Sequence, residues 1–273
     1  MRNATSFLRG LSVLDAFRPD DTELSLTQIA QRVNLPKSTA HRLVADLVAW
    51  GGLERTETGL RLGMRLFELG RLVPVQRELA EVARPFLEDL YNITNKTVNL
   101  AVLNKAEIVY IEKLEAPNSP TASRAGSRLP LHCTALGKAM LAFSPLALSD
   151  QIIQNGLAAV TERSITSVAT FRRELAAVRT TRLAFDREEL APGLFCIGTP
   201  IFDSRGALLG AISVSSLESI MGARTLGPAL LTISRALSRE FNPQPLKAEY
   251  LSSSYHTSMR GNQCPTPSAV CYP

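Results

Sequence analysis

Apolar residues recur at helical spacing near the start of the chain. Steps of three and four residues place the following side chains on one helical face: Phe7, Leu11, Leu14 and Phe17. This helix is predicted to stop at Pro19 and the acidic pair after it. A second, short helix is predicted after Ser25-Leu-Thr-Gln28, because a serine followed three residues later by glutamine is a capping-box pattern.

A third helix is predicted from Pro36 to about Trp50, after a turn at Asn34. Proline is favourable in the first turn, where its missing N–H costs no hydrogen bond, and a pair of glycines at 51 and 52 suits the helix end. Two short β-type runs follow, Leu53–Thr56 and Gly59–Leu62. Residues 1–62 are therefore predicted to form a winged helix-turn-helix domain.

Paired strands alternate with helices in the rest of the chain. Hairpins are predicted around Asn104-Lys105-Ala106 and Asp203-Ser-Arg-Gly206, which join strands 97–103 with 107–113 and 194–202 with 207–215. Helices are predicted at 135–143, 171–182 and 228–241. Strand pairs with helices between them predict an α+β domain around an antiparallel sheet.

Two apolar patterns between these domains predict further helices, one over 62–73 and one that begins at Glu78. Residues 63–78 are assigned to a linker helix and residues 79–243 to the second domain. Residues 244–273 contain many prolines and serines and few branched aliphatic residues, so this tail is predicted to be disordered.

Composition restricts the class of protein. The chain has 273 residues, of which 45% are hydrophobic and 20% charged, as in an ordinary globular protein. The longest apolar runs are too short to span a bilayer, and the N-terminus lacks the pattern of a secretory signal, so a cytoplasmic protein without membrane contact is expected. The four cysteines lack metal-ligand spacing, so reduced thiols and no metal or cofactor are expected.

Basic charge gathers on the predicted helix-turn-helix. The net charge is +5, and the segment between Glu23 and Asp46 carries Arg32, Lys37 and Arg42 but no acidic residue. Such a segment is typical of a phosphate-contacting surface. By charge alone, a solvated basic face fits equally well.

The third helix is the predicted recognition helix, because the N-terminal residues of the second helix of this motif reach base edges in the major groove. Arg42 can contact a guanine with two hydrogen bonds, and Arg55 and Arg61 on the wing can reach the backbone or the minor groove. The predicted DNA contacts are Ser25, Thr27, Pro36, Lys37, Ser38, Thr39, His41, Arg42, Arg55 and Arg61. A three-helix core that binds no DNA is the alternative. It is less favoured because cap, turn, basic helix, glycine pair and wing occur together in this order.

Three longer segments resemble the IclR family of bacterial transcription regulators. The segment Leu62-Gly-Met-Arg-Leu-Phe-Glu-Leu-Gly70 follows the predicted wing as in that family. Leu129-Pro-Leu-His-Cys-Thr-Ala-Leu-Gly-Lys-Ala139 is similar to the segment entering the family's effector pocket. Glu188-Glu-Leu-Ala-Pro-Gly-Leu-Phe-Cys-Ile-Gly-Thr-Pro-Ile-Phe-Asp203 resembles the family's signature. The resemblance covers residues 6–241. Leu60 stands where an aromatic residue is common, and Arg182-Leu183 where Gly-Tyr is usual.

The resemblance implies a GAF-like second domain that binds a small organic acid. Carried over by position, its effector-binding residues are Leu129, Ala135, Leu136, Asp186, Leu194, Cys196, Ser213 and Ser215. The residues are compatible with this role: Thr134 can cap the helix after it, whose first N–H groups would suit a carboxylate. Asp186 would accept a hydrogen bond from a ligand hydroxyl or repel a second negative charge. Without the resemblance, the cysteine and the serines would be interpreted as ordinary core or surface positions.

The sequence thus predicts a ligand-responsive transcription regulator, a repressor or dual regulator of a metabolic operon. It is expected to bind double-stranded operator DNA as a homodimer or a dimer of dimers, with subunit contacts through the linker helix and its neighbours. The alternative is a small-molecule sensor that regulates a protein partner.

An enzyme is the least favoured class. Adjacent residues His132 and Cys133 on a strand would point in opposite directions, and Gly137-Lys138 lacks the rest of a P-loop. The acidic residues Asp186, Glu188 and Glu189 are expected in a solvated loop before a strand.

Overall fold

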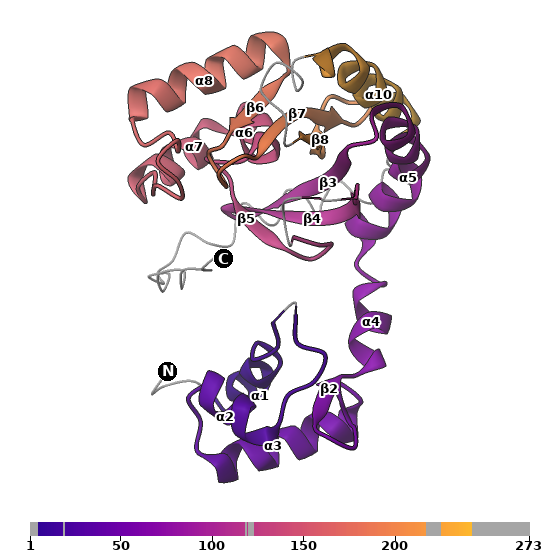
Figure 1. Ribbon diagram of the computed structural model, residues 1–273, viewed down its shortest axis with the longest axis vertical. Coiled ribbons are helices and arrows are strands. Elements are labelled where there is room, and N and C mark those ends of the chain that lie inside the picture. The colour runs from indigo at the N-terminus through magenta and orange to yellow at the C-terminus, as the bar shows by residue number, and fades with distance from the viewer. Residues whose placement is uncertain (1–4, 19, 118, 120–122, 217–224, 242–273) are drawn as a thin grey trace. The chain divides into compact units, whose positions relative to one another are not determined.

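The computed structural model describes residues 5–18, 20–117, 119, 123–216 and 225–241. The chain divides into two compact units, Met1–Arg77 and Glu78–Pro273 (Figure 1). No helix among the described residues is long and apolar enough to cross a membrane. The predicted tail, 244–273, lies outside the described residues.

The N-terminal unit is a helix-turn-helix followed by a two-stranded wing and a further helix. Its elements are α1 (Ser6–Leu14), α2 (Leu26–Arg32), α3 (Lys37–Trp50), β1 (Leu53–Arg55), β2 (Leu60–Leu62) and α4 (Met64–Gly70). Strands β1 and β2 pair antiparallel, with Arg55 opposite Leu60. Leu60 is buried and also pairs with Leu24, so an aliphatic side chain fills this wing position by joining the core of the unit.

Local sequence explains where these helices begin and end. The Ser25 N–H donates to Gln28 Oε1 over 2.8 Å, and the Gln28 N–H donates to Ser25 Oγ over 3.3 Å, which completes the predicted capping box. Asn34 takes a positive φ of 53° in the turn before α3, and Gly51 ends α3 with a φ of 84°. Gly63 must be glycine, since a Cβ there would lie 2.1 Å from the Gly51 carbonyl oxygen.

The C-terminal unit contains one antiparallel sheet of strand order β5-β4-β3-β8-β7-β6. The strands are β3 (Thr97–Asn104), β4 (Glu107–Leu114), β5 (Arg128–Pro130), β6 (Ala184–Arg187), β7 (Phe195–Phe202) and β8 (Leu208–Ser216). The helices are α5 (Pro74–Thr94), α6 (Ala135–Leu141), α7 (Leu146–Gln154), α8 (Val168–Thr181) and α10 (Gly227–Glu240).

Helices cover both faces of this sheet (Figure 1). One face packs on α6, with α7 and α8 behind it, in a core that includes Met140, Ile152 and Phe171. The other face packs on α5 and α10 through residues such as Leu87 and Leu237. Alternate side chains of each strand therefore enter different cores.

The predicted α+β class, with a winged helix-turn-helix before a domain of antiparallel sheet and helices, is confirmed. Some elements differ from the sequence prediction. Helix α5 begins at Pro74 rather than Glu78, because proline is accommodated in a first helical turn. Helix α4 is shorter than the predicted segment 62–73. Strands β5 and β6 and helix α7 were not expected from the sequence pattern.

Candidate DNA-binding surface and effector cavity

The N-terminal turn of α3 presents polar side chains to solvent. Pro36 occupies the N-cap position, and Lys37 is the first helical residue. Lys37, Ser38, His41 and Arg42 are exposed. The opposite face of α3 is buried through residues such as Leu43. This segregation leaves one face of α3 available to a partner.

The basic residues of this unit are not equivalent. Among the described residues, Lys37, Arg42 and Arg55 form no ion pair. Arg32 is bound to Asp21 and also donates to the Ala16 carbonyl over 2.9 Å, so it stabilises the unit internally and adds little to the positive segment predicted from the sequence. Its guanidinium holds the pKa of Asp21 below the usual range.

Arg61 of the wing is paired as well. Its Nε lies 2.9 Å from Glu54 Oε2, and this pairing lowers the pKa of Glu54. The Arg61 side chain is largely exposed and the Glu54 side chain partly exposed. A surface pair of this kind contributes about 0–1 kcal/mol, so a phosphate can compete for Arg61. Of the remaining predicted contacts, Thr27 and Arg55 are exposed, whereas Ser25 and Thr39 are partly buried.

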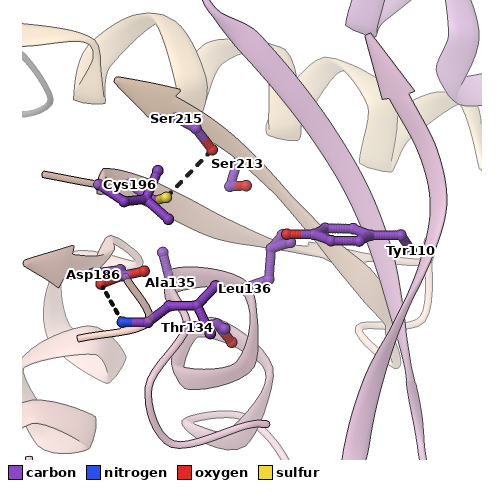
Figure 2. Close-up of a pocket in the computed structure, with 10 residues that line it drawn as sticks. Tyr110, Thr134, Ala135, Leu136, Asp186, Cys196, Ser213 and Ser215 are labelled. Atoms are coloured by element: carbon purple, nitrogen blue, oxygen red, sulfur yellow. Dashed lines mark hydrogen bonds between the residues drawn. The ribbon is translucent and has the colours of Figure 1, made fainter. Parts of the chain in front are cut away.

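The second candidate site is a small cavity between the sheet and α6, lined by residues of both (Figure 2). Its sheet wall is polar within an otherwise apolar core. Asn99 on β3 is buried, and its Nδ2 donates to Ser213 Oγ over 3.3 Å and to Ser215 Oγ over 3.1 Å. A buried polar cluster is tolerated when it is hydrogen-bonded, as this one is, and it gives this wall of the cavity groups that can bind a polar ligand.

Strand pairing places three cavity residues in one row. Asp186 on β6 lies opposite Cys196 on β7, and Cys196 lies opposite Ser215 on β8. Figure 2 shows the three side chains in this order along one wall. The Cys196 Sγ donates to Ser215 Oγ over 3.3 Å. Burial raises the pKa of the Cys196 thiol well above its usual value, so the sulfur keeps its proton.

Most of the predicted effector residues meet at this cavity. Those that line it are Ala135, Leu136, Asp186, Leu194, Cys196, Ser213 and Ser215. Leu129 does not line it and packs in the adjacent core on β5. Three further lining residues, Tyr110, Thr134 and Leu190, were not predicted as ligand contacts. Tyr110 lies two residues after Ile108, so the sequence alternation indicates that both side chains face the same core. The pairing of β4 with β3 in the sheet then brings Tyr110 to the cavity.

Helix α6 begins at this cavity, as expected, with Thr134 as its cap. The Gly137 N–H donates to Thr134 Oγ1 over 3.0 Å, while this hydroxyl donates to the Pro130 carbonyl over 2.9 Å. Gly137 allows the tight entry, because a Cβ there would lie 2.2 Å from the Leu131 carbonyl oxygen. The Thr134 hydroxyl therefore holds the start of α6 against β5.

The acidic segment after residue 185 is not the solvated loop expected from the sequence. Asp186 is 1% exposed and Glu189 2% exposed. Strand β6 and the turn that follows it pack on α6. There the fully buried Lys138 Nζ lies 2.5 Å from Glu189 Oε1 and 3.4 Å from Glu174 Oε1. The sequence prediction failed here because the cation that permits burial comes from a helix fifty residues earlier.

Among the described residues, no cation forms an ion pair with Asp186. Its Oδ1 accepts hydrogen bonds from the Glu189 N–H over 2.7 Å and the Leu190 N–H over 3.4 Å. Its Oδ2 is buried and has no partner in the described structure. Burial, together with the nearby Glu189 carboxylate, raises the pKa of Asp186 to about 7, despite the opposing effects of the two N–H donors and Lys138.

Cys133 and His132, the residues that a catalytic dyad would use, have structural roles. Burial raises the pKa of the Cys133 thiol to about 12, so it is not a nucleophile at neutral pH. His132 Nε2 lies 2.8 Å from the Ala158 carbonyl oxygen, within hydrogen-bond distance. Within the described part of the chain, no group of His, Cys, Asp and Glu side chains has the geometry of a metal site.

Two family models match the chain. The model for the IclR helix-turn-helix domain matches residues 6–57. The model for the C-terminal part of bacterial transcriptional regulator IclR matches residues 73–240.

Curated relatives span most of the chain. The HTH-type transcriptional regulator XynR of Escherichia coli K12 is 34% identical over 215 residues, which cover 77% of this chain and 85% of XynR. The HTH-type transcriptional repressor AllR of the same organism is 32% identical over 224 residues, which cover 80% of this chain and 82% of AllR.

Solved structures share the fold. An IclR homologue from Microbacterium hydrocarbonoxydans, in complex with 4-hydroxybenzoate, superposes with a TM-score of 0.74 at 29% identity and covers 85% of this chain and all of its own. The IclR protein of Thermotoga maritima superposes with a TM-score of 0.71 at 29% identity and covers 86% of this chain and 99% of its own.

Proposed function

Because this chain belongs to the IclR family of bacterial transcriptional regulators and is thus a DNA-binding regulator, we propose that α3 reads an operator while a small organic acid in the C-terminal cavity controls that binding. The observation that carries the first part is the exposed N-terminal face of α3, where Lys37 and Arg42 are free of ion pairs in the described structure. A regulator of this kind acts in the cytoplasm, as a repressor or dual regulator of a metabolic operon.

We assign the DNA contacts by their place on the unit. Lys37, Ser38, His41 and Arg42 contact base edges or phosphates from α3, as the N-terminal residues of a recognition helix do. Ser25 and Thr27 contact phosphates at the start of α2. Arg55 contacts the flanking backbone from the wing, and Arg61 does so when phosphate displaces it from Glu54.

Operator titrations at several salt concentrations test this part. The logarithm of the affinity for duplex DNA should fall linearly with the logarithm of the salt concentration, because phosphate contacts release counterions. Arg42→Ala should weaken operator binding by about 1–3 kcal/mol and relax specificity at one base pair. Affinity unchanged in Arg42→Ala would show that α3 is not the reading helix.

Arg32→Ala is the matched control for charge. This residue is bound to Asp21 inside the unit, so its loss should lower the stability of the unit more than it lowers the salt slope. A wild-type protein without salt-dependent binding to duplex DNA would instead favour the alternative function, a sensor that regulates a protein partner.

The effector part rests on the cavity. Its wall combines buried hydrogen-bonding groups with apolar residues, and this mixture is typical of small-molecule pockets. The 4-hydroxybenzoate complex of the Microbacterium homologue supports an organic acid as the ligand class.

Ser215→Leu tests the cavity. The larger apolar side chain would fill the space beside Cys196 and remove a hydroxyl, so the response to organic acids should be lost while operator affinity stays within twofold. Ser204→Leu lies in the exposed turn between β7 and β8, outside the cavity, and serves as the control. An effector response unchanged in Ser215→Leu would place the ligand elsewhere.

We further propose that two chains associate through the N-terminal unit, as a dimer or a dimer of dimers. Helix α4 exposes Met64, Phe67 and Leu69, and α1 exposes Phe7 and Leu8. Several large apolar side chains exposed on one helix are a feature of interaction surfaces. A two-fold dimer requires a near-palindromic operator whose half-sites lie about 34 Å apart or a multiple of it. Residues 63–78 then act as the linker between the DNA-binding domain, 1–62, and the effector-binding domain, 79–243.

A further inference from the structure

One ion pair of the wing lies on its solvent face. Glu54 and Arg61 are directly opposite each other on β1 and β2. Arg61 Nε lies 2.9 Å and Nη2 2.8 Å from the same oxygen, Glu54 Oε2. Because neighbouring positions of a strand point to opposite faces, the pair faces away from the side of the wing on which Leu60 enters the core. Arg61 is therefore accessible to a partner from solvent, but its guanidinium is already bound.

The other oxygen of Glu54 binds the start of α4. The Met64 N–H donates to Glu54 Oε1 over 3.1 Å. Met64 is the first residue of α4, and the N-cap residue, Gly63, offers no side-chain acceptor. The first N–H groups of a helix have no partner within the helix, so this carboxylate satisfies one of them. A single carboxylate thus connects the wing with the linker helix.

The backbone of this junction fixes the direction of the Met64 N–H. The Gly63 N–H donates to the Gly52 carbonyl, just after α3, over 2.9 Å. Glu54 is therefore oriented by the end of α3 and the start of α4 before Arg61 reaches it. A surface ion pair is usually weak because two long side chains must be held in one geometry. Here one of the two is already held, which favours the pair with Arg61.

The two arginines of the wing differ in their surroundings. Among the described residues, Arg55 forms no ion pair, whereas Arg61 is near two carboxylates. Glu23 accepts hydrogen bonds from the hydroxyls of Thr56 and Thr58, and these bonds, together with the Arg61 charge, lower its pKa. The wing therefore offers DNA one free guanidinium and a second one that an acidic side chain holds.

We propose that Glu54 is a positioning residue for DNA binding, which holds Arg61 away from the DNA backbone and is itself held in place by the start of α4. The wing then gains its second phosphate contact when a phosphate displaces the carboxylate or when α4 no longer holds it. This inference rests on the proposed function, because it takes Arg61 as a DNA contact. It adds a route by which the linker helix changes affinity without any change in the recognition helix.

Replacement of the carboxylate by an amide tests the hold on Arg61. Glu54→Gln keeps the side-chain shape, and its carbonyl oxygen can still accept from Met64, but it carries no charge. The probe is a duplex of about 30 base pairs of mixed sequence, because phosphate contacts do not depend on base sequence. In fluorescence-anisotropy titrations of the full chain, affinity should rise about twofold to fivefold for each wing on the DNA, the range over which a surface ion pair competes. A purely structural role of Glu54 would instead lower the affinity or leave it unchanged.

Glu57→Gln is the matched control for charge. Glu57 is exposed in the turn of the same wing and forms no ion pair among the described residues. Its gain in affinity measures what the loss of one negative charge contributes, and this gain should be the same with and without Arg61→Ala. The gain from Glu54→Gln should be larger than this in the wild type and fall to the same value in the Arg61→Ala background, because no arginine is left to release.

A proline at the first position of α4 tests the role of the linker helix. Met64→Pro removes the N–H that holds Glu54, while proline is favourable at this helical position. Gly63 already has the extended backbone that precedes proline, with φ −86° and ψ 156°. Met64→Ala is the control, since it loses the same side chain but keeps the N–H. DNA affinity should be higher in Met64→Pro than in Met64→Ala, by less than the gain from Glu54→Gln, and equal in both when Arg61→Ala is also present.

The outcomes separate this inference from the proposed function. Equal gains from Glu54→Gln and Glu57→Gln in the wild type would overturn the inference, because the loss of charge alone would explain both. Affinity in Met64→Pro that does not exceed that of Met64→Ala would overturn the control by α4. Weaker operator binding by Arg42→Ala would leave the proposed function standing in either case. A wild-type protein without salt-dependent binding to duplex DNA would overturn the proposed function itself.

Discussion

Asp186 shows how a single side chain is controlled by residues far from it in sequence. Its carboxyl group is buried by the fold, fixed by two backbone N–H groups and placed near the Glu189 carboxylate. Glu189 is compensated by the buried Lys138, whereas Asp186 is not. The result is a carboxyl group whose protonation changes near neutral pH, at the wall of a cavity.

This environment predicts a dependence of stability on pH. The pKa of Asp186 is about 7 in the folded chain and near 4 when unfolded, so between these values the folded state binds more protons. The contribution of this group to the free energy of unfolding should therefore fall as pH rises from about 4 to about 7, and stay constant above that. Urea unfolding of the wild type and Asp186→Asn at several pH values measures this change in the free energy of unfolding.

The comparison of the two proteins isolates the effect. Other titrating groups contribute to both, so the difference in unfolding free energy, variant minus wild type, should increase over this pH window by a few kcal/mol at most. A difference that does not change with pH would mean that the carboxyl group titrates at its ordinary value and is hydrated.

At the scale of elements, the capping box of α2 combines two roles in one residue. Ser25 caps the helix, and we also propose that it contacts a phosphate. Ser25→Ala should lower the stability of the N-terminal unit by about 1 kcal/mol, since the Gln28 N–H loses its acceptor. Ser25→Asp keeps a good cap but places a negative charge there, so stability should be retained while operator affinity falls.

Urea unfolding and mobility-shift titrations of both variants separate these roles. Operator affinity in Ser25→Asp equal to that of the wild type would show that this residue caps the helix without meeting DNA. Stability unchanged in Ser25→Ala would show that the cap contributes nothing.

Helix α8 ends at a residue that the family resemblance marked as unusual. Arg182 adopts a positive φ of 58°, where glycine is favoured. Its N–H still donates to the Val178 carbonyl over 2.7 Å, and its guanidinium lies 5.3 Å from the Phe202 ring centroid. The ring contact offsets part of the backbone cost, so the helix end is preserved without glycine.

At the scale of the whole molecule, association of two chains is the main proposal. Phe67 on α4 is 65% exposed. Phe67→Glu should shift the protein to monomers in sedimentation equilibrium and weaken binding to a palindromic operator, because charge is depleted from the centre of such interfaces. Ile93→Glu, an equally exposed site on α5, is the control and should leave the mass unchanged. Equal masses for wild type and Phe67→Glu would exclude α4 from the contact.

Local patterns in the sequence were sufficient for the helix-turn-helix, the wing and the two hairpins. Each depends on residues close together in the chain: Ser25 with Gln28, Gly51 after α3, and the turn at Asp203. The family resemblance added the positions of the cavity residues. Helical and strand periodicity needs no knowledge of distant contacts, which is why these elements were predictable.

Only the tertiary structure decided how charged and polar groups are paired. Arg32 forms an ion pair with Asp21 and so adds little to the basic surface, and Arg61 forms an ion pair with Glu54. Lys138 enters the core to meet Glu189, which turns a predicted solvated loop into a buried one. The physical reason is that an ionisable side chain is buried only when a distant partner compensates its desolvation, and the sequence alone does not reveal that partner. The row formed by Asp186, Cys196 and Ser215 arises in the same way, from the register of three strands.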